Sequence, residues 1–478
     1  MLWAIGAAYI YLSSNSSRDT AFYYEVANNI VSGCGFSLDT PSGCQPLAGG
    51  YFPGYPTVLS IALLANFKDP KMICICVYSL QILASLRLSK TIDMTKIVGT
   101  KSSTIAFAWI AISPLRFGFS RFALIEPCLA VISTVLVNEY LLSTVKQRSV
   151  LSWTSITCLT LGIYFKPTFV ITLPILAMLE IASKPKSLRK DWQRIFCSTL
   201  VVAALASPWM YRQASLNANN LSMYSNRVPP GFEEYRRWTR FITVTEYDHA
   251  AYHFSPGNNH DKDGRLKLPR LNPWVSYSDE DYRLVNDILR PGHQAGKVGF
   301  NAEEAATLTK AANMRKGKTN AFQMTTLNAL QSTSLLFHPL NSWGFPLEIS
   351  GLTEKLKTAD GRAFQANHLA LPLIGKLLLW IYRVFVAAVY VYRFSRDRAI
   401  PTTAPQKVRC TFDMLFNAGL AITVLHMILY VVLFSQLEHR YFSPLTIWVE
   451  LGPILYVLRL REDDLKHRQS QDDLRIQY

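Results

Sequence analysis

Residues 18–56 read RDTAFYYEVANNIVSGCGFSLDTPSGCQPLAGGYFPGYP and follow directly on an apolar N-terminal segment. The first part predicts an amphipathic helix, because apolar residues recur at every fourth position from Phe22 to Ile30. Asp19 can accept hydrogen bonds from the free N–H groups at the start of that helix, and the glycines from Gly33 onward allow it to stop. Such a helix is too short to cross a bilayer, so we expect it to lie along a membrane surface.

The composition of the chain is typical of a membrane protein. Of its 478 residues, 50% are hydrophobic and only 17% are charged, whereas about a quarter are charged in soluble domains. The formal net charge of +16 is explained by basic cytoplasmic loops that face anionic lipid. The sequence argues against nucleic-acid binding, because it has no basic stripe with interleaved aromatic residues.

The 8 cysteines fall into two groups. Most lie in apolar runs, where buried thiols are usual. Cys74 and Cys76 do not have the CxxC spacing of a metal knuckle. Cys34 and Cys44 share the opening loop and can form a disulfide if that loop lies outside the cytoplasm, whereas in a reducing compartment they stay thiols.

Hydropathy predicts an all-α polytopic membrane protein with about ten transmembrane helices. A short apolar segment at 2–12 is interpreted as a first span, whereas 55–67 is too short and is interpreted as re-entrant or surface-lying. The other candidate spans lie at 72–90, 101–119, 124–145, 150–165, 167–183, 195–211, 370–394, 412–436 and 441–460.

Hydropathy drops between 213 and 368, a stretch with turn clusters and a predicted helix at 278–315. We expect one small soluble insert there, on the non-cytoplasmic face of the membrane. The predicted organisation is therefore an N-terminal transmembrane module at 1–212 with an outer loop at 14–71, the insert at 213–368, C-terminal transmembrane helices at 369–460, and a basic cytoplasmic tail at 461–478.

The charges of the connecting loops predict which helix ends face the cytoplasm. With the N-terminus inside, every strongly basic connection falls on the cytoplasmic side, and counting 55–67 as a full span would break this rule. The basic connections carry Arg87, Lys90, Lys96 and Lys101; Lys146 and Arg148; Lys184 to Arg194; Arg393 to Arg409; and Arg459 to Arg468. Polar residues from distant parts of the chain then share the opposite, outer face: Asp19, Glu25, Arg121, Glu126, Lys166, Arg212 and Glu438-His439-Arg440-Tyr441.

Taken one at a time, these residues have structural interpretations. Asp19 and Glu126 can serve only as helix caps, and Lys166 and Arg212 can serve only as interfacial anchors. Together, however, carboxylates and cations on one membrane face suit group transfer. A carboxylate can act as a base towards a hydroxyl group, and Arg or Lys can hold a phosphate leaving group.

Two other charged clusters are open to more than one interpretation. Glu438 and Arg440 can simply pair with each other. Asp261-Lys262-Asp263 resembles a metal-binding DxD motif, but in a Gly/Asn-rich loop it is more typical of a solvated turn. A divalent metal is therefore possible and is not supported further, and we expect no cofactor to be required.

Several short motifs follow one another along nearly the whole chain. They are Asp19 with Tyr23-Tyr24 and Ala27-Asn28; Gly33-Cys34-Gly35-Phe36-Ser37; Pro53-Gly54-Tyr55-Pro56; Arg121-Phe122-Ala123-Leu124-Ile125-Glu126-Pro127; Lys166-Pro167-Thr168; Ser207-Pro208-Trp209-Met210-Tyr211-Arg212; and Glu438-His439-Arg440-Tyr441-Phe442-Ser443-Pro444. In this order they resemble the GT-C glycosyltransferases, which include the aminoarabinose transferases of lipid A and the dolichyl-phosphate-mannose protein mannosyltransferases. The chain departs from that pattern in its short first span and in carrying the soluble domain between spans.

The resemblance implies transfer of a sugar from a polyprenyl-phosphate donor to a lipid, glycan or protein acceptor, with inversion, on the non-cytoplasmic face. Asp19 would be the general base, and Glu126 a second acid that orients donor or acceptor. The implied donor-phosphate ligands are Lys166, Arg212 and Arg440, and the implied substrate-binding residues are Glu25, Tyr24, Tyr55, Arg121, Glu438 and Tyr441.

The resemblance also implies an integral protein of a bacterial inner or plasma membrane, with its active site on the periplasmic or external face. No nucleotide-binding fold or Gly-rich phosphate loop is present to bind a nucleotide sugar. The alternative is a membrane transporter or lipid flippase, which would have charged residues in mid-span and symmetric halves with broken helices. The only such break in the sequence is Lys166-Pro167, at a predicted outer interface.

Overall fold

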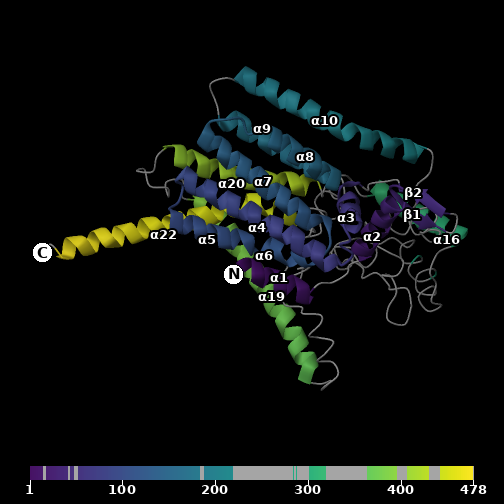
Figure 1. Cartoon of the computed structure of the whole chain (residues 1–478), viewed down its shortest axis with the longest axis horizontal. Helices are drawn as coiled ribbons and strands as arrows, with labels where there is room; N and C mark the ends of the chain where they lie inside the picture. Colours follow the sequence, from purple (N-terminus) through teal and green to yellow (C-terminus); the bar gives the residue numbers. More distant parts are fainter. Residues whose placement is uncertain are drawn as a thin grey trace. The chain divides into compact units, whose positions relative to one another are not determined.

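A computed structural model describes residues 1–13, 18–40, 43–47, 52–183, 188–218, 284, 287, 301–318, 363–395, 406–429 and 442–476. The chain divides into two compact units, the first made of Met1–Leu221, Ser342–His426 and Arg440–Tyr478, and the second of Ser222–Asn341 and Met427–His439. In the second unit the structure describes mainly helix α16 (Ala302–Lys318), which overlaps the helix predicted at 278–315. The described residues are mostly helical (Figure 1).

Five of the described helices are long and apolar enough to cross a membrane. They are α4 (Pro70–Thr95), α7 (Ile125–Lys146), the stretch Asp191–Leu216 of α10 (Leu188–Ala218), Leu377–Ser395 of α19 (Ala363–Ser395) and Val408–His426 of α20 (Gln406–Leu429). The prediction of a helical membrane protein is confirmed at this level, and each of the five helices coincides with a predicted span. The total of ten spans stays a prediction.

The remaining predicted apolar segments form shorter helices. They are α1 (Leu2–Ser13), α3 (Gly54–Leu64), α5 (Thr100–Ala111), α8 (Trp153–Phe165), and the 3-10 helix η2 (Pro167–Ile171) continued by α9 (Thr172–Ser183). After the short helix η6 (Ser443–Leu445), the last helix α22 (Thr446–Ile476) runs on through the predicted basic tail.

The predicted continuous span at 101–119 is wrong. Helix α5 ends at Ala111, and two short helices follow, α6 (Pro114–Phe117) and η1 (Gly118–Arg121). Ser113 has an extended ψ of 125°, because the ring of Pro114 disfavours a helical conformation in the residue before it. Ser113 and Arg116, which lie at this break, are buried.

Helix α7 lies among the other helices of the first unit, next to α4, α8, α9 and α22, while α8 and α9 separate it from α10 (Figure 1). The polar contacts between α4 and α7 show that these two helices run in the same direction. Gln81 Nε2 donates to Thr134 Oγ1 at 3.2 Å, and further along both helices Thr91 Oγ1 donates to Asn138 Oδ1 at 2.7 Å. The starts of α4 and α7 therefore lie at one end of the unit and the basic connections that follow them at the other.

The opening loop contains a small antiparallel hairpin that the sequence analysis did not predict. Strand β1 (Ser37–Thr40) pairs with β2 (Gly43–Pro46), and a disulfide joins Cys34 to Cys44, with 5.9 Å between their Cα atoms. One of the two alternatives for these cysteines is thereby confirmed.

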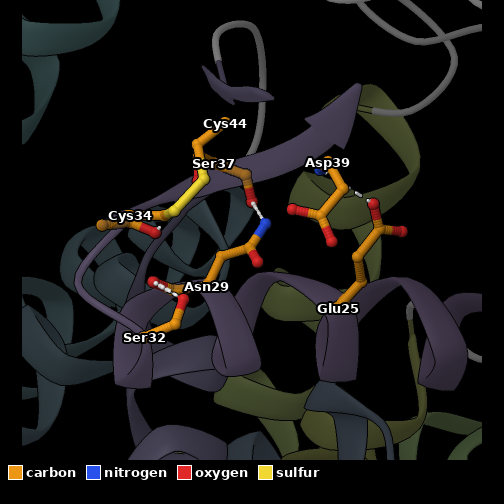
Figure 2. Close-up of a disulfide and its surroundings, with 8 residues drawn as sticks. Glu25, Asn29, Ser32, Cys34, Ser37, Asp39 and Cys44 are labelled. Carbon is orange, nitrogen blue, oxygen red and sulfur yellow. Dashed lines mark hydrogen bonds between the residues drawn. A yellow bond between two sulfur atoms is a disulfide. The ribbon is translucent and has the colours of Figure 1, made fainter. Parts of the chain in front are cut away.

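Figure 2 shows the hairpin lying over helix α2 (Arg18–Val31). The side-chain amide of Asn29 donates to the carbonyl of Ser37 at 3.2 Å. Gly33, with φ of +88°, follows the helix end as predicted. Helix α2 begins at Arg18, so Asp19 lies within its first turn and is not the N-cap that was predicted.

Candidate active site

The structure brings Glu126 and Lys166 together from two separate elements. Glu126 is the second residue of α7 and is buried, and Lys166 sits at the break between α8 and η2. The backbone of Lys166 is extended, with φ −154° and ψ 118°, as expected for a residue before proline. Its Nζ lies 3.6 Å from Glu126 Oε1. Two residues chosen from the sequence for chemistry thus form an ion pair at the end of α7 remote from the basic connections.

The start of helix α2 is attached to the same place. Thr20 Oγ1 donates to the carbonyl of Ala123 at 3.2 Å in a buried contact. Ala123 lies three positions before Glu126, in the turn that leads into α7. This contact fixes the backbone next to Asp19 beside the approach to Glu126, while the side chain of Asp19 lies outside the described part of the structure.

Aromatic residues join α2 and α3 to the segment that carries Lys166. Tyr55 is 1% exposed, and its ring meets that of Tyr23 edge-on with 5.2 Å between centroids. The ring of Phe165, the residue before Lys166, lies 6.5 Å from that of Tyr55. Gly54 packs closely on the backbone of α8. A Cβ added to Gly54 would lie 2.8 Å from the carbonyl group of Tyr164 and from the amide nitrogen of Phe165. Only glycine fits this contact between α3 and the end of α8.

Tyr24, a predicted substrate-binding residue, has a buried hydroxyl without a hydrogen-bond partner among the described residues. Burial raises the pKa of Tyr24 well above its ordinary value, and burial raises the pKa of Tyr55 in the same way. Both phenols therefore stay protonated across the physiological range and can serve as hydrogen-bond donors.

Two other predicted site residues anchor the hairpin. The guanidinium of Arg212 donates to the carbonyls of Leu47 at 3.1 Å and Phe36 at 3.2 Å, and it lies over the ring of Trp209 with 4.6 Å to the centroid. Glu25 accepts a hydrogen bond from the backbone N–H of Asp39 at 3.2 Å (Figure 2). These contacts give Arg212 and Glu25 a positioning role in the outer loop, and within the described residues Arg212 makes no contact with the Glu126–Lys166 pair.

Arg121 is 2% exposed, and its guanidinium lies 4.7 Å from the centroid of the Phe122 ring. The predicted residues Glu438, Arg440 and Tyr441 lie outside the described residues, as does the DxD stretch at 261–263. Phe442 is described again: its ring lies 5.0 Å from that of His426, which in turn interacts electrostatically with Lys166. In the described part of the chain, no group of three or more His, Cys, Asp or Glu side chains is placed to hold a metal ion.

The sequence analysis missed a second buried ion pair close to Glu126. Arg116, in the short helix α6, places Nη2 3.1 Å from Glu450 Oε2 in α22. Ser113 Oγ donates to the other oxygen of Glu450 at 2.6 Å. Arg116 and Glu126 line one cavity. A glutamate within the apolar run of a predicted span was an available signal, since buried charges in such segments have functional or structural partners.

Comparisons of the chain with protein-family models, with curated proteins and with solved structures found no match.

Proposed function

We propose that this protein is a membrane glycosyltransferase that moves a sugar from a polyprenyl-phosphate donor to a hydroxyl acceptor on the non-cytoplasmic face. The observation that carries the proposal is the pairing of buried Glu126 with Lys166 at the end of α7 remote from the basic connections, next to the start of α2. A carboxylate and a cation in one place match the two needs of the reaction, a group that directs a hydroxyl and a group that holds a phosphate. The resemblance of the motifs to GT-C glycosyltransferases supports the same assignment.

In this proposal the acceptor oxygen forms a bond to the anomeric carbon while the bond from that carbon to the phosphate oxygen breaks. The phosphate leaves with the electron pair of that bond, and its negative charge is held by Lys166, with Arg440 as a further phosphate ligand. The acceptor proton passes to Asp19, the general base, and Glu126 orients the sugar or the acceptor. Attack from the face opposite the phosphate inverts the anomeric centre.

The other site residues are assigned roles in the same scheme. Arg212 orders the hairpin through two carbonyls, and the remaining N–H groups of its guanidinium keep the predicted capacity for the phosphate. Tyr24 and Tyr55 are donors towards the substrate or towards the groups that hold it. We place the site on the external or periplasmic side of a bacterial plasma membrane, with a lipid, a glycan or a protein as the acceptor.

The test of the proposal is Asp19→Asn in the purified full-length protein in lipid nanodiscs. Release of undecaprenyl phosphate is measured from its mannosyl, glucosyl, galactosyl and arabinosyl derivatives, with membrane extract as the acceptor source. We expect the rate to fall by about a hundredfold or more, since positioned base catalysis typically supplies about 10²–10⁴ in rate. The fold should be kept, because asparagine has nearly the size and hydrogen-bonding capacity of aspartate.

A matched control comes from a second acid at a helix start. Asp69 is the N-cap of α4, and its side chain accepts a hydrogen bond from the backbone N–H of Lys71 at 2.9 Å. Asparagine caps helices about as well as aspartate, so Asp69→Asn should transfer sugar at the parent rate. Equal rates in both variants and the parent would remove Asp19 from the mechanism. Movement of the intact donor between leaflets without release of the carrier would instead support the transporter alternative.

A further inference from the structure

A small cavity lies between α4, the α6–η1 segment, α7 and η6. It has room for about one water molecule. Its polar lining consists of Tyr78, Gln81, Arg116, Ser120, Glu126 and Ser443. The cavity therefore joins Glu126, which the proposed mechanism uses, to Arg116, which it does not.

Three of these side chains present polar atoms that have no hydrogen-bond partner among the described residues. They are Nε and Nη1 of Arg116, Oε1 of Gln81 and the hydroxyl of Tyr78. Arg116 is 5% exposed, Gln81 7% and Tyr78 1%. Buried polar groups are normally paired, and leaving them unpaired costs free energy. Three side chains that line one cavity and carry unpaired donors and acceptors therefore indicate a polar guest.

The guanidinium of Arg116 is held in place so that one edge stays available. Its Nη2 atom is occupied by Glu450 at 3.1 Å and by the carbonyl of Ile110 at 3.0 Å. Tyr382, which accepts a hydrogen bond from Trp109 Nε1 at 3.0 Å, interacts with this same pair from α19. The remaining N–H groups of Arg116, a residue that lines the cavity, have no hydrogen-bond partner among the described residues.

The charges around the cavity exclude an ionic guest. Arg116 is neutralised by Glu450, and Glu126 by Lys166, so a phosphate or an ammonium group would find no uncompensated opposite charge. A neutral group that both donates and accepts hydrogen bonds satisfies Arg116, Gln81 and Tyr78 together. A hydroxyl group has this chemistry, and it has the size of the water molecule that the cavity accommodates.

We propose that this cavity is a binding subsite for one hydroxyl group of a saccharide, located beside Glu126. The inference rests on the proposed function and deepens it. The hydroxyl comes from the donor sugar or from a sugar acceptor, and the same groups recognise either. A subsite of this kind selects strongly, because an analogue without the hydroxyl leaves the buried polar groups unpaired.

The experiment measures equilibrium binding to the purified full-length protein in nanodiscs, independently of transfer. In the donor arm, the dissociation constant of undecaprenyl phosphate is divided by that of its mannosyl, glucosyl, galactosyl and arabinosyl derivatives. In the acceptor arm, the probes are the octyl glycosides of the same sugars. Tyr78→Phe removes only the hydroxyl, and Arg116→Lys keeps the charge opposite Glu450 but removes the fixed fork of donors.

We expect the parent to bind at least one glycosylated carrier or octyl glycoside about tenfold more tightly than the other probes of that arm. Tyr78→Phe and Arg116→Lys should each abolish most of this preference. A tenfold loss of preference corresponds to the loss of about one hydrogen bond. If the variants lose the preference in the donor arm, the hydroxyl belongs to the donor sugar. If they lose it in the acceptor arm, the hydroxyl belongs to the acceptor. Arg87→Lys, which changes an arginine beside Glu139 at the other end of α7, should leave both arms unchanged.

Two results would overturn the subsite. One is a parent without preference among the sugars, and the other is a preference that survives in folded Tyr78→Phe and Arg116→Lys proteins. Binding of bare undecaprenyl phosphate separates this outcome from a failure of the proposed function. If the parent and variants bind the bare carrier equally, only the subsite is rejected, whereas a parent that does not bind the carrier at all contradicts the glycosyltransferase itself.

Discussion

Helix α7 carries one buried glutamate near each end, and the two differ in how fully they are paired. Glu139 accepts from Arg148 at 2.5 Å and from Ser152 Oγ at 3.1 Å, and Arg87 lies 3.6 Å away. Glu126, about 20 Å away along the helix axis, has one charged partner in the described structure, Lys166 at 3.6 Å. Both side chains are almost inaccessible to solvent.

This difference indicates that Glu139 has a structural role, whereas Glu126 is available to a ligand. Glu139 lies at the end where the basic connections meet, and its neighbours there are paired as well, with Glu180 accepting from the backbone N–H of Val150 at 2.6 Å. Both hydrogen bonds to Glu139 go to Oε2, whereas its Oε1 has Arg87 at 3.6 Å and no hydrogen-bond partner among the described residues. Glu126 keeps acceptor capacity and borders a cavity. Burial and charge alone would not distinguish the two ends, but the number of partners does.

We expect the two ends of α7 to lie on opposite sides of the membrane, and cysteine labelling tests this expectation with an all-or-none result. Lys68→Cys, before α4, and Lys101→Cys, in α5, are both exposed positions. Each cysteine is introduced separately into a variant in which the exposed Cys76, Cys197 and Cys410 are replaced by serine. An impermeant maleimide should label Lys68→Cys in right-side-out vesicles and Lys101→Cys only after detergent. Labelling of both in intact vesicles would refute the sidedness.

Among the substitutions at the two ends of α7, Glu126→Gln should give the largest loss of activity. The amide keeps the shape of the side chain but loses the negative charge that directs the hydroxyl, so transfer should fall by about a hundredfold or more. Thermal unfolding in detergent should stay close to that of the parent, since only one ion pair is removed. A variant with parent-like turnover would show that the acid serves only as the partner of Lys166.

Lys166→Met should act on donor binding. The substitution keeps the apolar stem and removes the charge, which is worth roughly 1.5–3 kcal/mol for a hydrogen bond to a charged group, or about a 10- to 100-fold increase in KM for the polyprenyl-phosphate sugar. Lys166→Arg is the matched control and should recover part of that loss. An unchanged KM in Lys166→Met would leave the phosphate to other cations.

Glu139→Gln should have the smallest effect and a different kind of effect. Its partners Arg87 and Arg148 are partly open to solvent, with side-chain exposures of 62% and 39%, so the loss of stability should be only about 1–2 kcal/mol. Chemical unfolding in detergent measures this loss, and the rate of sugar transfer should not change. A fall in transfer comparable to that of Glu126→Gln would mean that the two ends of α7 do not differ in function.

Much of this protein was predictable from local patterns. Apolar run lengths located the five long helices, and the glycine at position 33 marked the end of α2. The spacing of Cys34 and Cys44 indicated a possible bridge, which the structure contains. Loop charges predicted that Glu126 and Lys166 share one side, and the two side chains do form an ion pair. These features depend on hydropathy, backbone conformation and charge along short stretches, which a sequence displays directly.

Other features were decided by tertiary structure. Pro114 is visible in the sequence as a helix breaker within the predicted span at 101–119. The break is stabilised by Glu450, a residue 337 positions away from Ser113. Arg212 was predicted as a phosphate ligand from the resemblance of its motif, and only the packing of α10 against the hairpin decided that its guanidinium also holds two carbonyls. The sequence determined which residues carry charge and on which end of a helix they lie. Only the folded chain decided how many partners each charge has, because hydrogen bonds form between groups that packing brings within about 3 Å, whatever their separation along the chain.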